Sequence, residues 1–128
     1  MTTPTFTLDT PDTQALLDRA HLHQDAGDHR TAVRFLTQAA TQEPGDTAIL
    51  TELALAQFHT AALPAAEATA RHLITLAPTD AYGHLLLGRT LARQSRHREA
   101  LPHLRLAVAM SGQWADHLTE SEARAQPR

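Results

Sequence analysis

The amino-acid sequence predicts an all-α protein of about seven helices, and three observations support this fold class. First, the 128 residues include only three Phe, one Tyr and one Trp, so the core must consist mainly of Ala and Leu, which suit closely packed helices. Second, apolar residues recur at helical spacing, for example at Leu50, Leu53 and Ala54. Third, the chain contains an internal repeat at a constant period, which predicts a stack of similar helical units.

The repeat is visible in residues that recur at a constant interval. Pro44 and Pro78 lie 34 residues apart, and Gly112 stands 34 residues further on, where a third proline would fall. Small residues at fixed places in each unit predict helices that pack in the same way three times. Three further sets keep the same 34-residue step: Asp12, Asp46 and Asp80; Ala20, Ala54 and Gly88; and Ala32, Ala66 and Ala100.

The first helix of each unit is expected to begin directly after the recurring aspartate. An Asp carboxylate there can accept hydrogen bonds from the exposed backbone N–H groups, and it faces the positive end of the helix dipole. Breaks are expected around Gly27, in "HTAALP" and in "RQSR". After the second break, Pro64 is expected at the first position of the next helix, where the missing N–H has no partner to lose.

The second helix of each unit carries an apolar stripe at positions i, i+4, i+7 and i+8, which predicts a face packed on a partner helix. Alanine at the crossing points lets two helix axes approach closely. Each unit is therefore predicted to be an antiparallel helix pair that cannot bury its apolar faces alone. The three stripes are Ala32, Leu36, Ala39 and Ala40; Ala66, Ala70, Leu73 and Ile74; and Ala100, Leu104, Ala107 and Val108.

This organisation resembles the tetratricopeptide repeat family over residues 12–112. The resemblance implies a right-handed superhelix (an α-α superhelix) whose first helices line a concave face and whose second helices form the convex face. His84 stands where the family usually has a bulky apolar residue, and Pro102, inside a second helix, should kink that helix or delay its start. We expect a flexible leader over 1–11, repeats over 12–45, 46–79 and 80–112, a capping helix over 113–124 and a tail over 125–128.

The chemistry of the sequence favours binding over catalysis. The absence of Cys excludes disulfides, thiolate zinc sites and cysteine nucleophiles. No Gly-rich phosphate loop, G-x-S-x-G elbow or H-E-x-x-H motif occurs. His21 and His23 are two positions apart, and on a helix such side chains point in different directions and cannot share a metal ion. We therefore expect no enzymatic activity, no cofactor and no metal site.

The charge and hydropathy of the sequence limit the expected cellular location and the expected classes of partner. The chain has no basic and apolar signal segment at its start and no apolar run long enough for a membrane span, so we expect a cytoplasmic location and no membrane partner. Residues 1–67 contain nine acidic residues and three Arg (net charge −6), whereas residues 68–128 contain five and eight (net charge +3). Nucleic acid is not an expected partner, because the chain is acidic overall and its aromatic residues do not interleave with Arg.

The groove that the family resemblance implies takes its residues from the three first helices. Leu55 and Phe58 lie off the face that packs in the core, and they would continue an apolar strip toward Arg89 and Arg93, which project together at i, i+4. Leu85 also fits an ordinary core position between repeats. The predicted groove comprises Leu17, His21, Gln24, Thr51, Leu55, Phe58, His59, Tyr82, Leu85, Arg89 and Arg93.

Arg89, Arg93, Arg96 and Arg98 form the one basic concentration in the sequence. Two interpretations stay open at this stage: a solvated face of ion pairs, or a site for an acidic ligand. One subclass of the family clamps a terminal carboxylate with Lys and Asn side chains. This chain has neither residue type, so that subclass is not expected.

An apolar strip rimmed by charge is typical of a partner site. We therefore predict a protein–protein interaction module, an adaptor or scaffold, that binds a peptide or an amphipathic helix in its concave groove. One alternative is a homo-oligomer, in which the acidic first unit meets the Arg-rich third unit of a neighbour or two grooves bury each other. The other alternative is a non-catalytic accessory subunit of an enzyme or regulator.

Overall fold

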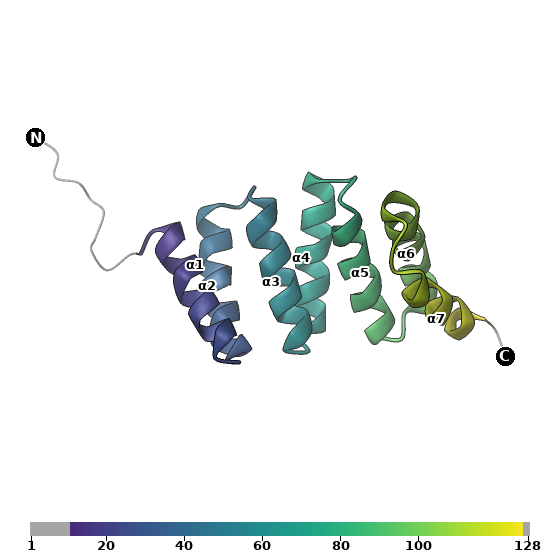
Figure 1. Ribbon diagram of the computed structural model, residues 1–128, viewed down its shortest axis with the longest axis horizontal. Helices are drawn as coiled ribbons and strands as arrows, with labels where there is room; N and C mark the ends of the chain where they lie inside the picture. Colours follow the sequence, from purple (N-terminus) through teal and green to yellow (C-terminus); the bar gives the residue numbers. More distant parts are fainter. Residues whose placement is uncertain (1–10, 127–128) are drawn as a thin grey trace, which may run out of the picture.

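The protein is described by a computed structural model over residues 11–126, and in this part of the chain it contains helices and no strand. Figure 1 shows the helices side by side in one row, with α1 and α7 at opposite ends. The predicted all-α superhelix is confirmed, whereas the predicted leader lies outside the described residues except for Pro11. The helices are α1 (Thr13–Asp25), α2 (His29–Gln42), α3 (Thr47–His59), α4 (Leu63–Leu76), α5 (Ala81–Arg93), α6 (His97–Ser111) and α7 (Ala115–Ala125).

The helices pack as three antiparallel pairs followed by a single helix. The closest packing joins α1 with α2, α3 with α4, and α5 with α6. Consecutive pairs then contact each other through α2 and α3, and through α4 and α5, while α7 packs on α6. The predicted helix pairs are thus confirmed, and each pair covers the apolar face of the next.

The recurring aspartates begin the first helices, as predicted. The side chain of Asp12 accepts a hydrogen bond from the Ala15 amide, and Asp46 and Asp80 do the same at the starts of α3 and α5. One further repeat step leads to Trp114, which precedes α7 without a side-chain cap and has a φ of 67°. Helix α7 therefore stands in the register of a fourth first helix, and it covers 115–125 rather than the predicted 113–124.

The first helices also end alike, in a turn that recurs once in each repeat. Gly27, Ala61 and Ser95 each have a positive φ, of 78°, 59° and 61°. Two amides of each turn bond back to carbonyls of the preceding helical turn, for example Ala62 N–H to Gln57 O and Ala61 N–H to Phe58 O. This is the Schellman arrangement, which usually carries Gly at the left-handed position.

Two prolines behave differently from the expectation. Pro64 occupies the second position of α4 rather than the first, because the helix already begins at Leu63. Pro102 lies inside α6, which begins at His97, so the predicted delay of that helix is wrong. Pro102 is exposed, which leaves the packed side of α6 intact.

The core follows the predicted stripes of the second helices. Ala66, Ala70 and Leu73 of α4 are buried, and so are their counterparts in α2 and α6. In the third repeat, a Cβ added to Gly88 would lie 2.6 Å from Leu104 Cδ2, so this position has no room for a larger residue unless Leu104 moves. His84 is buried as well, and one of its ring nitrogens bonds to the Pro78 carbonyl oxygen at 2.8 Å.

Candidate functional site

The predicted groove residues are found in α1, α3 and α5, but they are not equally accessible. Leu17, Leu55 and Tyr82 are half-buried and contact the core with part of their surface. Phe58 and Leu85 are only 5% and 2% exposed, so the expected exposed strip is wrong at these two positions. Leu85 is a core residue between repeats, which was its alternative interpretation, and Phe58 is covered by arginine side chains.

Phe58, near the end of α3, is the centre of a cluster that we call the Phe58 platform: Phe58, Arg89 and Arg93. The guanidinium carbons of Arg89 and Arg93 lie 4.7 and 4.6 Å from the centroid of the Phe58 ring. Arg93 also donates a hydrogen bond from Nη1 to the Phe58 carbonyl oxygen at 2.9 Å. Both guanidinium groups thus lie against one aromatic ring, which is favourable through cation–π attraction. The hydrogen bond from Arg93 also places a cation at the negative end of the α3 dipole.

In the amino-terminal part of the groove, a hydrogen bond joins α1 to α3. His21 Nε2 lies 2.9 Å from Glu52 Oε1, so the side chains of α1 and α3 bond to each other. Thr51 bonds within its own helix, through its hydroxyl to the Thr47 carbonyl oxygen. His59 is exposed beside the Phe58 ring, and Gln24 is half-buried in α1. These predicted site residues therefore do not come together with the Arg residues in one place.

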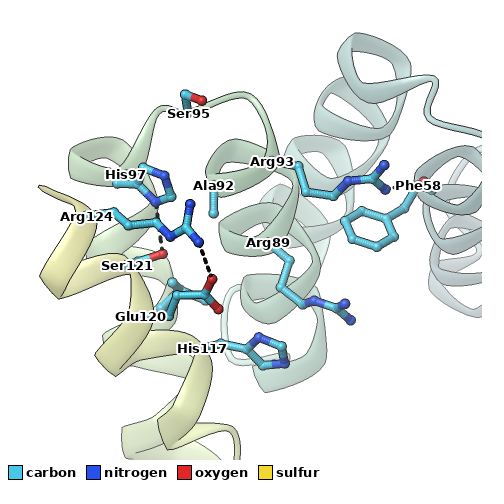
Figure 2. Close-up of a pocket in the computed structure, with 11 residues that line it drawn as sticks. Phe58, Arg89, Ala92, Arg93, Ser95, His97, His117, Glu120, Ser121 and Arg124 are labelled. Atoms are coloured by element: carbon cyan, nitrogen blue, oxygen red, sulfur yellow. Dashed lines mark hydrogen bonds and ion pairs between the residues drawn. The ribbon is translucent and has the colours of Figure 1, made fainter.

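A cavity of about 340 Å³ continues from the Phe58 platform toward the last helix. Figure 2 shows Arg89 and Arg93 on α5 at one side of it, and side chains of α7 at the other. Arg124 Nη2 lies 3.0 Å from Glu120 Oε1 across one turn of α7, and the His97 ring lies 3.3 Å from the Ser121 hydroxyl. The lining residues are Phe58, Arg89, Ala92, Arg93, Ser95, His97, Leu104, His117, Glu120, Ser121 and Arg124.

The contribution of α7 to this cavity was not predicted from the sequence. His117, Glu120, Ser121 and Arg124 all belong to the helix that was predicted only to cap the last repeat. Continuing the repeat register from Asp80 to position 114 would have aligned α7 with α5 and placed Ser121 at a position that is Leu in the second and third repeats. That step was hidden because residue 114 is Trp and not Asp.

The other two arginines of the basic concentration are bound within the chain. Arg96 bonds to both oxygens of Glu99, at 2.7 and 2.8 Å, and to Glu67 Oε1 at 2.6 Å. Arg98 donates to the Ala125 carbonyl oxygen at 3.3 Å. The ion-paired interpretation therefore holds for Arg96, and Arg89 and Arg93 alone of the four line the cavity.

Glu67 of α4 connects the second repeat to the third. Partial burial alone would raise the pKa of its carboxyl, but hydrogen bonds from Arg96, Gln94 and Arg71 outweigh that effect and hold the pKa below its usual value of 4.5. The pKa of Glu99 is also lowered, chiefly by its hydrogen bonds from Arg96. This network is charged at neutral pH, and it fixes the loop between α5 and α6 that borders the cavity.

Residues 11–126 contain neither a cluster of metal-binding side chains nor a helix suited to a membrane. In that part of the chain, no three His, Asp or Glu side chains are grouped so that they could hold a metal ion. None of the seven helices there is both long and apolar enough to cross a membrane. The arrangement of the cavity, with guanidinium groups at one edge and a polar wall opposite, is suited to binding an anionic or polar group.

Comparison with protein families identifies the repeat. The family model described as tetratricopeptide repeat matches residues 23–90, which is more than half of the chain. No curated protein sequence matches the chain. The matched range includes α2, α3, α4 and most of α5, and therefore the Phe58 platform except Arg93.

Several solved structures share the fold. MamA from Desulfovibrio magneticus RS-1, from residue 41 to its end, has a TM-score of 0.82 and 19% identity over 89% of this chain and 66% of that one. The first TPR domain of Spaghetti (RPAP3), bound to the HSP90 peptide SRMEEVD, has a TM-score of 0.75 and 15% identity over 93% and 97%. YrrB, described as a TPR protein with an unusual peptide-binding site, has a TM-score of 0.79 and 15% identity over 89% and 59%. At sequence identities as low as these, the similarity shows a shared fold only.

Proposed function

This chain belongs to the tetratricopeptide repeat family, and on that premise we propose that it is a protein–protein interaction module that holds a peptide or an amphipathic helix of a partner in its concave groove. In this proposal the chain is an adaptor or scaffold and has no catalytic role. Its binding end is the carboxy-terminal half, from the Phe58 platform to α7.

One observation carries the proposal. The platform presents two guanidinium groups beside a cavity of about 340 Å³. Leu55 and Tyr82 are half-buried on the same helices and would supply apolar contacts to a ligand. Apolar anchors beside charged groups are the usual composition of a peptide-binding groove.

The solved structures of similar fold support the same class of ligand. The Spaghetti domain is bound to an HSP90 peptide, and YrrB is described by its peptide-binding site. Both are proteins of low identity to this chain, so they support the use of the groove and not the identity of the peptide. The Phe58 platform is the feature of this chain that would decide its own preference.

Selection from a phage-displayed library of random 16-residue peptides tests the proposal. We expect peptides to be enriched on the immobilised chain, and equally on the variant Ala68→Glu, which changes a surface position of α4. We expect enrichment to be lost on Leu55→Glu, which places a charge in the groove. Helicity is measured for all three proteins. Failure to enrich peptides on the folded wild-type chain would contradict the proposal.

Self-association and an accessory-subunit role are the alternatives. An interface between the acidic first repeat and the Arg-rich third repeat has less support than the sequence suggested, because Arg96 and Arg98 bond within the chain. Light scattering decides between a single chain of 14.0 kDa and a larger assembly. A cytoplasmic location stays a prediction from the sequence.

A further inference from the structure

We propose that α7 forms one wall of a site for an acidic side chain. The polar cavity between α5 and α7 would take the carboxylate of an Asp or Glu in the bound peptide, with Arg89 on one side and Arg124 on the other. This inference rests on the proposed function. It adds the chemistry of the ligand and gives the last helix a part in binding it.

The repeat register aligns α7 with the first helices of the repeats. Helix α7 begins at Ala115, one repeat step after Ala81 at the start of α5, so each of its residues has a counterpart in the repeats. Leu53 and Leu87 occupy one such position in α3 and α5, where they are 5% and 0% exposed and fill the space between repeats. In α7 the same position is Ser121. The other polar counterparts are His117 for Gly83, Glu120 for Leu86 and Arg124 for Thr90.

These replacements explain why a cavity exists at this place. A Ser side chain is shorter and smaller than the Leu side chain at the equivalent positions, so α7 cannot fill the space against α5 and α6 as α3 and α5 fill theirs. Protein interiors are normally packed without such spaces. The lining includes Phe58, Ala92 and Leu104, but most of the lining residues are charged or polar, so we infer that these would meet a polar group of a ligand.

The second argument is the sign of the charge. The cavity is lined by three arginines, Arg89, Arg93 and Arg124, and by one carboxylate, Glu120. His97 and His117 can only add positive charge. A concave wall with this excess attracts anions, and the effect is stronger in a partly enclosed space than on an open surface.

The third argument is the geometry of Arg89. Its guanidinium lies over the Phe58 ring, and the N–H groups of a guanidinium lie in its plane, so they remain able to donate at the edge. Within residues 11–126, the ion pairs of the chain include neither Arg89 nor Arg93. The two guanidinium carbons contact the same ring, so their charges lie within about one Debye length of each other (~10 Å at 0.1 M salt). An incoming carboxylate would relieve their repulsion.

For Glu120, the inference predicts a substitution that strengthens peptide binding, whereas substitution of the arginines should weaken it. It pairs with Arg124 at 3.0 Å, and both side chains are exposed, so a carboxylate of the ligand would compete with it for Arg124. Removing the charge of Glu120 should therefore strengthen the binding of an acidic peptide. A variant that strengthens binding cannot be explained by damage to the fold.

The experiment uses the same random 16-residue library on the full chain. Peptides are selected on the wild type, and the best peptide is synthesised in two forms, one with its Asp and Glu residues and one with Asn and Gln in their place. Fluorescence anisotropy then gives the affinity of both peptides for wild type, Arg89→Gln, Arg124→Gln, Glu120→Gln and the control Arg34→Gln. Arg34 is an exposed residue of α2, far along the chain from the cavity.

We expect the acidic form to bind the wild type about tenfold more tightly than the amide form. Arg89→Gln and Arg124→Gln should reduce that preference to about twofold or less, Glu120→Gln should increase the affinity of the acidic form about two- to fivefold, and Arg34→Gln should change neither. Selected peptides that bind equally well in both forms would overturn this inference and leave the proposed function intact. A failure to select any peptide on the folded wild type would overturn both.

Discussion

Two junctions on the concave face use the same helix register and differ in what they present to a ligand. At the junction of α1 and α3, the His21 ring bonds to the Glu52 carboxylate, so each of these polar side chains has a partner within the chain. At the junction of α3 and α5, the positions of His21 and Glu52 are taken by Leu55 and Leu86, which form no such bond, and Arg89 of α5 lies on the Phe58 ring. At the first junction the two polar side chains bond to each other, whereas at the second the side chains of Arg89 and Arg93 line the cavity.

The difference shows how one backbone design can carry a site at one end only. The helices of both junctions begin with a capping Asp and end in the same turn, so the backbone does not distinguish them. The distinction comes from a few side chains at equivalent positions. The proposed ligand site therefore lies in the carboxy-terminal half, and the following substitutions test how the two halves differ, from the largest expected effect to the smallest.

The largest effect is expected from Phe58→Ala. The ring is 5% exposed and supports both guanidinium groups, so its removal should lower the free energy of unfolding by about 3 to 5 kcal/mol. His59→Ala, at the adjacent exposed position, should change it by less than about 0.5 kcal/mol. Urea unfolding measures both. Equal effects of the two substitutions would mean that Phe58 is a surface side chain and that the platform does not exist.

Gly88→Ala tests the tighter packing of the third repeat. The earlier repeats have Ala20 and Ala54 at this position, but a Cβ on Gly88 would lie 2.6 Å from Leu104 Cδ2. We expect the substitution to lower the free energy of unfolding by about 1 to 3 kcal/mol through overpacking. Gly45→Ala is the control, because no atom lies within 4 Å of an added Cβ there. If thermal unfolding ranked Gly45→Ala as the more harmful change, the packing described for α5 and α6 would be wrong.

Glu67→Gln tests the network that joins the second repeat to the third. The folded-state pKa of Glu67 lies below its usual value of 4.5, so its stabilisation is fully present above that value and is lost as pH falls through the folded pKa. We expect Glu67→Gln to cost about 1 kcal/mol at neutral pH and to flatten the loss of stability as the solution is acidified. The measurement is urea unfolding at several pH values. An unchanged pH profile would remove Glu67 from the network.

The smallest effect is expected at the turns after α3 and α5. Ala61 and Ser95 have positive φ values, whereas the first repeat has Gly27 at the same place. Ala61→Gly and Ser95→Gly should each raise the free energy of unfolding by about 0.5 to 1 kcal/mol, because Gly adopts this conformation without strain. Gly27→Ala should lower it by a similar amount. Thermal unfolding measures all three, and destabilisation by both Gly substitutions would contradict the left-handed turns.

Much of the fold could be predicted because its determinants are local and recur. The capping aspartates predict where the first helices begin, and the alanine stripes predict which face of the second helices is packed. The repeat step predicts that the helix pairs are stacked. The breaks at Ala61 and Ser95 were predicted, but their left-handed conformation was not, since no glycine marks it there. Their conformation is imposed by the packing of the helices on either side.

The site was harder to predict than the fold, for two physical reasons. Helical periodicity assigned Phe58 to an outer face, and it could not show that two long side chains from another repeat cover that face. The polar wall of the cavity depends on aligning α7 with the repeats, although Trp114 replaces the capping Asp at its start. Contacts between side chains distant in sequence decide both features, and a pattern within one helix does not contain them.

The most direct test of the account is where a ligand contacts the chain. Amide chemical shifts of the ¹⁵N-labelled protein are followed while a peptide selected on the wild type is added. The account predicts that the shifts change in the last turn of α3, along α5 and along α7, with Arg89, Arg93 and Arg124 among the residues affected, and that α1 and α2 stay unchanged. Changes centred on His21 and Glu52, or on the outer helices α4 and α6, would contradict it.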